Sequence, residues 1–293
     1  EMSGFFANAH GLEVRLSDID YDHSRRDIDL PYQWVNHLKV LSHTSWQGER
    51  LRMEANLAWQ NNHREELSEP VSHGYMPKPD GTLERRFVKN TLTGNVALHF
   101  PIGSRHELSA GVNAEYQHNR RGGWGFIIPD FETASVGVYA MDRYTLSEAL
   151  KVNAGVRLDY ANTHISSYHD WFTTPISNVV SVYKERSADI DRSFTSATWS
   201  AGINYAIGHW VLKANVGKSF RVPIPKELGA DGVNYHIFRY ERGNASLDPE
   251  ESYQLDMGIH WDNDVVCVQV DPYVNYFPNY IYLNPTAEYV EGL

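Results

Sequence analysis

The sequence contains one cysteine, Cys267, and no long apolar run. A single cysteine excludes a disulfide within the chain and any site built from several cysteines. A helix that crosses a membrane needs roughly 18 consecutive apolar residues, and no segment approaches that length. The formal charge of −11 leaves no basic surface to neutralise phosphates, which argues against a nucleic-acid partner.

What the chain has instead is strict alternation of apolar and polar residues. Between 107 and 117 every second residue is apolar, from Leu108 to Tyr116, and the residues between them are polar or glycine. The segments 51–60, 151–160 and 251–261 repeat the pattern. A helix would need apolar residues at spacings of three and four, so these segments are predicted to be strands.

The same reading predicts about eleven strands, most of them as long as the roughly 9–11 residues that a tilted membrane strand needs. They lie near 11–17, 33–46, 50–60, 87–101, 106–118, 133–145, 150–161, 193–207, 209–219, 251–261 and 265–277. Short connections alternate with long ones, which lie at 18–32, 61–86, 119–132, 162–192 and 220–250. Short turns at one rim and long loops at the other are typical of an outer-membrane barrel.

The fold expected is therefore all-β, an antiparallel transmembrane barrel. Aromatic residues such as Trp59, Tyr160, Trp210 and Trp261 fall at the ends of the apolar rows, where membrane interfaces favour them. Eleven or twelve strands with charged inward rows predict part of a larger wall, of about 22 strands. Residues 1–293 are expected to form one partial barrel domain. The chain opens at Glu1 without the charged and apolar regions of a secretory leader, and it is expected to be an internal fragment. The alternative is a soluble sandwich whose core ends are closed by these rings.

Three motifs carry a family resemblance. Residues 218–228 read K-S-F-R-V-P-I-P-K-E-L, residues 240–252 read Y-E-R-G-N-A-S-L-D-P-E-E-S, and residues 273–286 read Y-V-N-Y-F-P-N-Y-I-Y-L-N-P-T. In this order and strand context they resemble the C-terminal half of TonB-dependent outer-membrane receptors. The positions that match the family pattern are Phe220, Arg221, Pro223, Glu227, Leu228, Gly243, Asn244, Leu247, Pro249 and Glu250.

From the residues alone, these motifs have a structural role. The prolines end the strand ladder because they cannot donate, and Gly243-Asn244 supplies a turn. Arg221, Glu227 and Glu250 are expected to form a charge cluster at the loop base, with direct ligand contact as the alternative.

The resemblance implies active import of a scarce nutrient: an iron-siderophore complex, haem, cobalamin, a metal or a glycan. It also implies an outer-membrane location and a plug domain, outside this chain, that engages the TonB energy-coupling complex. A surface lipoprotein is a further partner that the resemblance leaves open. The alternatives are a passive porin or structural barrel and, further away, a soluble carbohydrate-binding β-protein.

Histidines and aromatic residues in the long loops are the candidates for ligand contact, because they suit haem, metal or ferric-chelate capture. They are His73, Trp124, His164, His169, Tyr235, His236 and Tyr240. The loops also contain Tyr168 and Trp171. No motif of a catalytic or metal site is present, so no enzyme activity, resident cofactor or metal site is expected.

Overall fold

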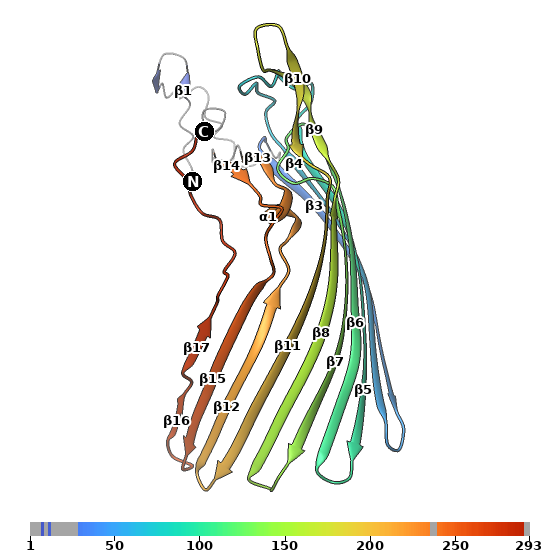
Figure 1. Cartoon of the computed structure of the whole chain (residues 1–293), viewed down its shortest axis with the longest axis vertical. Helices are drawn as coiled ribbons and strands as arrows, with labels where there is room; N and C mark the ends of the chain where they lie inside the picture. The colour runs from blue at the N-terminus through green and yellow to red at the C-terminus, as the bar shows by residue number, and fades with distance from the viewer. Residues whose placement is uncertain (1–6, 9–10, 13–28, 235–238, 290–293) are drawn as a thin grey trace, which may run out of the picture.

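The computed structural model describes residues 7–8, 11–12, 29–234 and 239–289, and most of these form one large curved sheet (Figure 1). The sheet has eleven strands, and its order is β16-β15-β12-β11-β8-β7-β6-β5-β4-β3, with β17 also paired to β15. All of these pairs are antiparallel. Apart from β17, which pairs with β15 rather than β16, each strand pairs with the strand that precedes it in the sheet-forming part of the chain. The continuous antiparallel sheet expected from the sequence is confirmed.

The long strands of the sheet are β3 (Tyr32–Gln47), β4 (Arg52–Leu67), β5 (Leu83–Ile102), β6 (His106–Gly122), β7 (Phe131–Thr145), β8 (Leu150–Ile165), β11 (Ile190–Ile207), β12 (Trp210–Arg221) and β15 (Glu250–Asp262). The short ones are β16 (Cys267–Val270) and β17 (Tyr273–Tyr276). Most strands run further than their alternation predicts, because the ladder continues into the polar segments above the apolar band.

Short turns join the strands at one end of the sheet, here called the short-turn end (Figure 1). At the other, the loop end, lie the hairpin β9 (Tyr168–Pro175) and β10 (Ser181–Ser187), the helix α1 (Pro225–Gly229), and the pair β13 (Asp231–Asn234) and β14 (Arg239–Arg242). The long connections expected at 162–192 and 220–250 therefore contain short strands and a helix of their own, which the sequence pattern did not predict. No helix among the described residues is long and apolar enough to cross a membrane.

The first and the last of the predicted strands differ from what the structure shows. The strand expected at 11–17 lies mostly outside the described residues, and only Gly11–Leu12 is placed, paired with Ala7–Asn8. The strand expected at 265–277 is two strands, β16 and β17, with Asp271 and Pro272 between them. Proline has no backbone N–H to donate to a ladder, so the break falls where the sequence places it.

Cross-strand register separates an apolar face from a polar face. A row of directly opposed residues runs through five strands as Val96, Val112, Val138, Leu158 and Ala197. One position along, the row becomes Asn95, Asn113, Gly137, Asp159 and Ser196. On the apolar face Val138 is 48% exposed and Leu158 59%, although these side chains avoid water. A face of this kind needs an apolar environment.

Glycine allows a close approach on the polar face. A Cβ at Gly137 would overlap the side chains of Arg157 and Asp159. Those two are joined by an ion pair, in which Arg157 Nε donates to Asp159 Oδ2 over 2.7 Å. Charged groups on this face therefore pair with one another across a position that has no side chain.

One charged residue lies in the apolar row of β7. Asp142 Oδ2 is 2.7 Å from His106 Nδ1, and the His106 ring stacks on Tyr144 at 4.4 Å between centroids. This group sits at the short-turn end, where a membrane interface tolerates polar tips. The carboxylate is thus placed at the margin of the apolar band.

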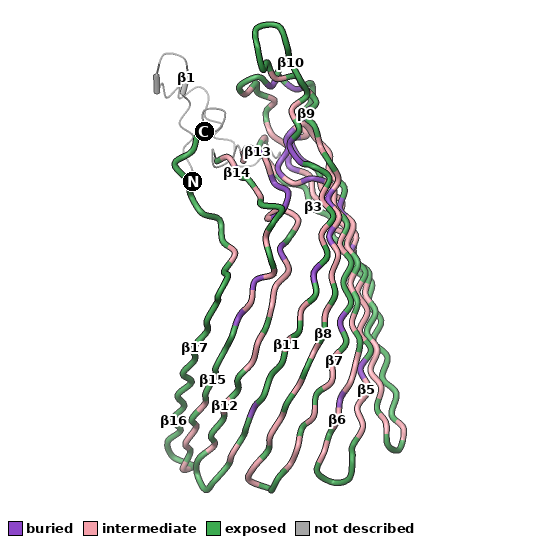
Figure 2. Tube along the Cα trace, viewed as in Figure 1, coloured by how far each residue is buried: buried purple, intermediate pink, exposed green. Residues whose placement is uncertain are grey.

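Buried residues concentrate where the strands meet the loop end (Figure 2). The buried apolar cluster there contains Ile165, Phe194 and Leu228, and the partly buried Phe131, Ile190, Val222 and Leu247 pack against it. The packed core of this chain therefore holds the base of the loops rather than the middle of the sheet.

The two faces make a direct prediction about lipid contact. In the full-length protein, Val138→Arg should destabilise the inserted state by roughly 2–4 kcal/mol, because it places a charge at mid-height on the apolar face. Ser135→Arg, three residues away on the polar face and opposite Glu115, should change little. Both can be measured as unfolding free energies from vesicles; equal losses would show that neither face contacts hydrocarbon.

Candidate functional site

The candidate site is the loop end of the sheet, where α1, β9, β10, β13 and β14 rise above the strands (Figure 1). Ten of the residues singled out by the sequence motifs surround the base of this region. Their contacts hold the loops in place where the hydrogen-bond ladder of the large sheet ends.

Arg221 joins three segments at the end of β12. Its Nη1 donates to Glu227 Oε2 of α1 over 2.8 Å, and its Nη2 donates to Glu250 Oε2 at the start of β15 over 3.2 Å. Glu227 also accepts the Ile224 N–H over 2.9 Å, which caps α1, and Glu250 accepts the Ile281 N–H over 2.8 Å. The charge cluster expected from these three residues is present, and it fixes the helix to both strands.

Gly243 and Asn244 cross directly under α1. The Gly243 N–H donates to the Ala230 carbonyl over 2.6 Å, and the Asn244 N–H donates to the Glu227 carbonyl over 2.7 Å. A Cβ at Gly243 would lie 2.8 Å from Glu227 O and 2.9 Å from Ala230 N, which are backbone atoms that cannot rotate away. The glycine is therefore required by packing against the helix.

The remaining motif residues pack or close turns. Leu228 and Leu247 join the buried cluster around Ile165, and Pro223 is fully buried. Asn244 Oδ1 accepts the Ser246 N–H over 2.9 Å, which forms a local turn. The Pro249 carbonyl accepts from Asn279 Nδ2 over 2.6 Å, and Phe220 is half-buried at the end of β12.

A second polar network ties the β9–β10 hairpin to β13 and β14. Arg186 Nε donates to Asp170 Oδ2 over 2.8 Å, and both side chains are more than nine-tenths buried. Arg186 Nη1 also donates to the Tyr240 hydroxyl over 3.2 Å, and that hydroxyl donates to Asp231. Burial, followed by the bond to Asp231, raises the pKa of Tyr240 well above its ordinary value, although Arg186 opposes the shift. Tyr240 is therefore neutral and structural in this position.

Glu241 is the carboxylate of β14, and only 2% of its side chain is exposed. Lys226 Nζ lies 2.5 Å from Glu241 Oε2, and Arg239 Nη2 lies 2.5 Å from Oε1. Burial alone would raise the pKa of this carboxyl, but the two cations outweigh it and the pKa lies below its ordinary value. The carboxylate therefore stays charged and holds β14 against α1.

An aromatic cavity opens beside the hairpin, with a volume of about 490 Å³. It is lined by Pro79, Asp80, Gly81, Leu83, Arg121, Gly123, Trp124, Tyr168 and Trp171. The Arg121 guanidinium lies 4.1 Å from the centre of the Tyr168 ring, which in turn stacks on Phe126 at 4.3 Å. Trp171 Nε1 donates to the Trp124 carbonyl over 3.0 Å, so loops distant in sequence form one wall. Rings combined with a cation suit a ligand that carries aromatic groups and negative charge.

The candidate ligand residues are only partly brought together. Trp124 lies in the aromatic cavity, and Tyr240 borders a second cavity of about 600 Å³ with Arg239, Arg242 and residues 283–289. His73 lies in a tight turn bridged to Met76, His169 is exposed on β9, and His164 lies 4.0 Å from Asp191. Tyr235 and His236 lie outside the described residues. Among the described residues, the candidate histidines therefore form no common cluster.

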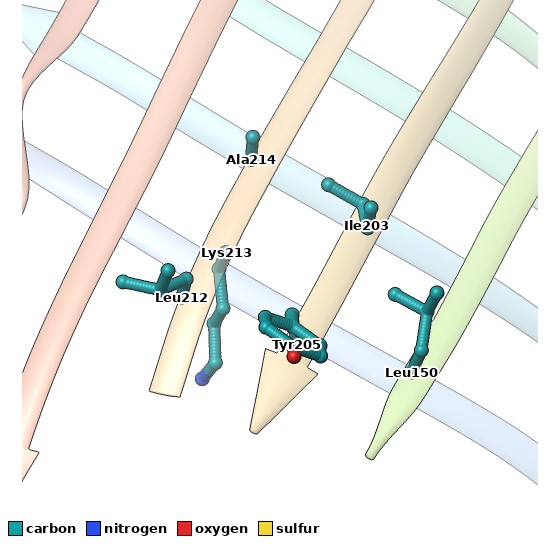
Figure 3. Close-up of a pocket in the computed structure, with 6 residues that line it drawn as sticks. All are labelled: Leu150, Ile203, Tyr205, Leu212, Lys213 and Ala214. Atoms are coloured by element: carbon teal, nitrogen blue, oxygen red, sulfur yellow. The ribbon is translucent and has the colours of Figure 1, made fainter. Parts of the chain in front are cut away.

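A third depression, of about 530 Å³, lies on the apolar face near the short-turn end (Figure 3). Leu150, Ile203 and Leu212 line it with aliphatic side chains. Its aliphatic lining and its place between strands suit a lipid chain rather than a polar nutrient.

Sequence reasoning missed the buried networks around Arg186, Glu241 and Arg121. Each joins segments separated by long stretches of chain, and no spacing pattern marks such pairs. The one signal available in the sequence was that the period of two in β6 continues beyond the apolar residues. Extended in this way, the period puts Arg121 on the polar face of β6.

Comparison with known proteins places the chain in a family. The family model described as TonB dependent receptor-like, beta-barrel matches residues 5–292, and the chain belongs to this family of outer-membrane receptor barrels. The rhizobactin receptor of Rhizobium meliloti (strain 1021) is 22% identical over 198 residues, which are 63% of this chain and 26% of that receptor.

Solved structures show the same fold. The Serratia marcescens hemophore receptor HasR, a double mutant in complex with its hemophore HasA and heme, superposes with a TM-score of 0.65 at 18% identity, over 85% of this chain and 40% of that one. The copper transporter OprC gives 0.63 at 18% identity, over 84% and 39%. The ferric yersiniabactin uptake receptor FyuA from Yersinia pestis gives 0.59 at 11% identity, over 84% and 36%. This chain thus spans well under half the length of these receptors, all of which are transport proteins rather than enzymes.

Gly243 supplies a test of the loop base. Gly243→Ala should destabilise this region by about 1–3 kcal/mol, because the new methyl group overpacks against the backbone of α1. Limited proteolysis of the folded protein should then cleave within 222–249 faster. Gly81→Ala is the matched control, since a Cβ there meets nothing within 4 Å. Equal cleavage rates in the two variants would contradict the packing role.

Glu241 gives this region a pH dependence. A carboxylate whose pKa is lowered on folding stabilises above its ordinary pKa of 4.5, and that contribution is lost as the pH falls through the folded pKa. The protection factors of the amides of 239–243 against hydrogen exchange should therefore fall below pH 4.5 in the wild type, and much less so in Glu241→Gln. Glu288→Gln, which alters an exposed pair 3.9 Å from Arg242, should keep the wild-type profile. A wild-type profile in Glu241→Gln would refute the assignment.

Proposed function

We propose that this chain is the receptor-barrel part of an outer-membrane protein that binds a scarce nutrient at its loop end and imports it. The observation that carries the proposal is the aromatic cavity around Arg121, Trp124, Tyr168 and Trp171. The cavity lies at the loop end of the large sheet, which has one polar and one apolar face. Membership of the receptor family supports the same reading. Residues 1–293 are proposed to act as one partial barrel domain.

The ligand class that fits best is a ferric chelate with aromatic or carboxylate groups, that is, a siderophore. Trp and Tyr faces offer flat apolar contacts, and Arg121 offers a cation whose other partners are the carbonyls of Gly123 and Gly125. Haem, cobalamin, a free metal and a glycan are the other candidate nutrients. A free metal fits least, because the described candidate histidines lie apart.

Import is proposed to be energised through the TonB complex, by way of a plug domain outside residues 1–293. The second candidate, a passive porin or structural barrel, would need no energy source. Uptake that stops when the proton gradient is collapsed supports active import, whereas uptake that continues supports the passive alternative.

Uptake by a deletion strain tests the cavity. Cells carrying the full-length protein should accumulate a labelled ferric siderophore from a panel, and Trp171→Ala should raise the half-saturating concentration about tenfold, or about 1.4 kcal/mol of binding. Trp171→Phe keeps a ring and should lose less. The matched control is Tyr183→Ala, because Tyr183 is 60% exposed on the same hairpin and lies outside the cavity lining. If the Trp171 and Tyr183 variants behave alike, the cavity does not bind the nutrient.

A further inference from the structure

The short-turn end of β15 and β16 brings together three different metal-binding side chains. His260 and Asp262 are two residues apart on β15, so they share a face. Cys267, the first residue of β16, is paired directly with Asp262 across the hairpin. One donor atom from each of these three residues lies within 4.8 Å of the other two.

The face they share is the polar one. Trp261, between His260 and Asp262, belongs to the apolar row, and its ring lies 6.3 Å from that of Trp210 on the neighbouring strand. The donors therefore point away from the apolar surface, into the space that the polar rows border. His260 is half-buried, whereas Asp262 and Cys267 are exposed, so an ion can reach all three.

The distances match a tetrahedral ion. Cys267 Sγ lies 3.8 Å from His260 Nδ1. Two ligands of a tetrahedral zinc ion, one a sulfur and one a nitrogen, are separated by about 3.6 Å when the bonds have their usual lengths. Cys267 Sγ also lies 4.0 Å from His260 Nε2, nearly the same distance, so the imidazole ring must turn to direct one nitrogen toward an ion shared with the sulfur.

The turn holds the aspartate in position. Asp262 Oδ1 accepts the Asp264 N–H over 2.9 Å, and Asp264 takes the left-handed conformation, with φ of 68°. The Asp262 carbonyl accepts from His209 Nδ1 over 2.7 Å, which ties the hairpin to the adjacent turn. One carboxylate oxygen, Oδ2, stays free of the turn bond and can serve as a ligand.

We propose that His260, Asp262 and Cys267 form a binding site for a thiophilic metal ion, of the class of Zn²⁺, Co²⁺ or Cu⁺, at the short-turn end of the polar face. A thiolate and an imidazole select these ions over Mg²⁺ and Ca²⁺, which prefer oxygen ligands alone. Three protein ligands leave the fourth position of a tetrahedral ion open to water or to an exchanging ligand. Binding requires the thiolate and so releases the Cys267 proton to solvent. This site is independent of the nutrient cavity at the loop end.

Cobalt titration of the full-length protein in detergent tests the site. Addition of Co²⁺ should produce a thiolate-to-cobalt charge-transfer band in the near ultraviolet, and Zn²⁺ should abolish it by displacement. The band should be absent in Cys267→Ser. In His260→Gln and Asp262→Asn the affinity should fall at least about tenfold, the smallest loss expected even for the outer partners of metal ligands.

His106→Gln is the matched control, because His106 also lies at the short-turn end beside an aspartate, Asp142, but on the apolar face. Its titration should equal that of the wild type. The heat-dependent gel shift of each variant establishes that the barrel is folded. A wild-type protein without the band, or an undiminished affinity in His260→Gln, would overturn the proposal, the latter by showing that Co²⁺ binds to the thiol alone.

Discussion

The backbone hydrogen-bond ladder is the constraint on which this structure depends. Each long strand from β4 to β12 pairs along both sides, so nearly every peptide group of the wall has a partner in the next strand. Hydrocarbon offers no substitute for such a partner, and each unsatisfied group there would cost several kcal/mol. Once the ladder sets the register, it also decides which side chains lie opposite one another, such as Val112 with Val138 and Asn113 with Gly137. The separation of an apolar face from a polar face is thus a result of backbone pairing.

The loop end is held by a different interaction. There the continuous ladder stops, and ion pairs take its place. Arg186 and Asp170 form a buried pair, and the pairs of Arg221 with Glu227 and Glu250 and of Lys226 with Glu241 are partly buried. Removing charges from water is costly, so such pairs specify one arrangement more than they add stability. The stability of this region comes in part from the small cluster of buried apolar side chains around Ile165 and Leu228. The aromatic cavity rests on this base, since Tyr168 follows directly from the strand that carries Ile165.

The sequence predicts the wall well because the relevant pattern is local. Alternation over ten residues identifies each strand, and the motif from Phe220 to Glu250 identifies the loop base and even its charge cluster. The β9–β10 hairpin was missed because its residues show no strong alternation, and its order comes from contacts such as Trp171 with Trp124. The cluster of His260, Asp262 and Cys267 was missed for a related reason. Its third member lies across a turn whose register only the structure defines.

The strict pairing of β4 to β12 has a consequence for how such a chain can change over generations. Gaining or losing one residue within a strand would turn every later side chain of that strand to the opposite face. An insertion or deletion in the wall therefore comes as a pair of residues or needs a bulge, such as the register shift at Glu66 and Leu67 between β4 and β5. The tip of the β9–β10 hairpin at 176–180 can lengthen or shorten freely. Changes in length are thereby confined to the rim, and the wall can be inherited unchanged in length while the loops above it change.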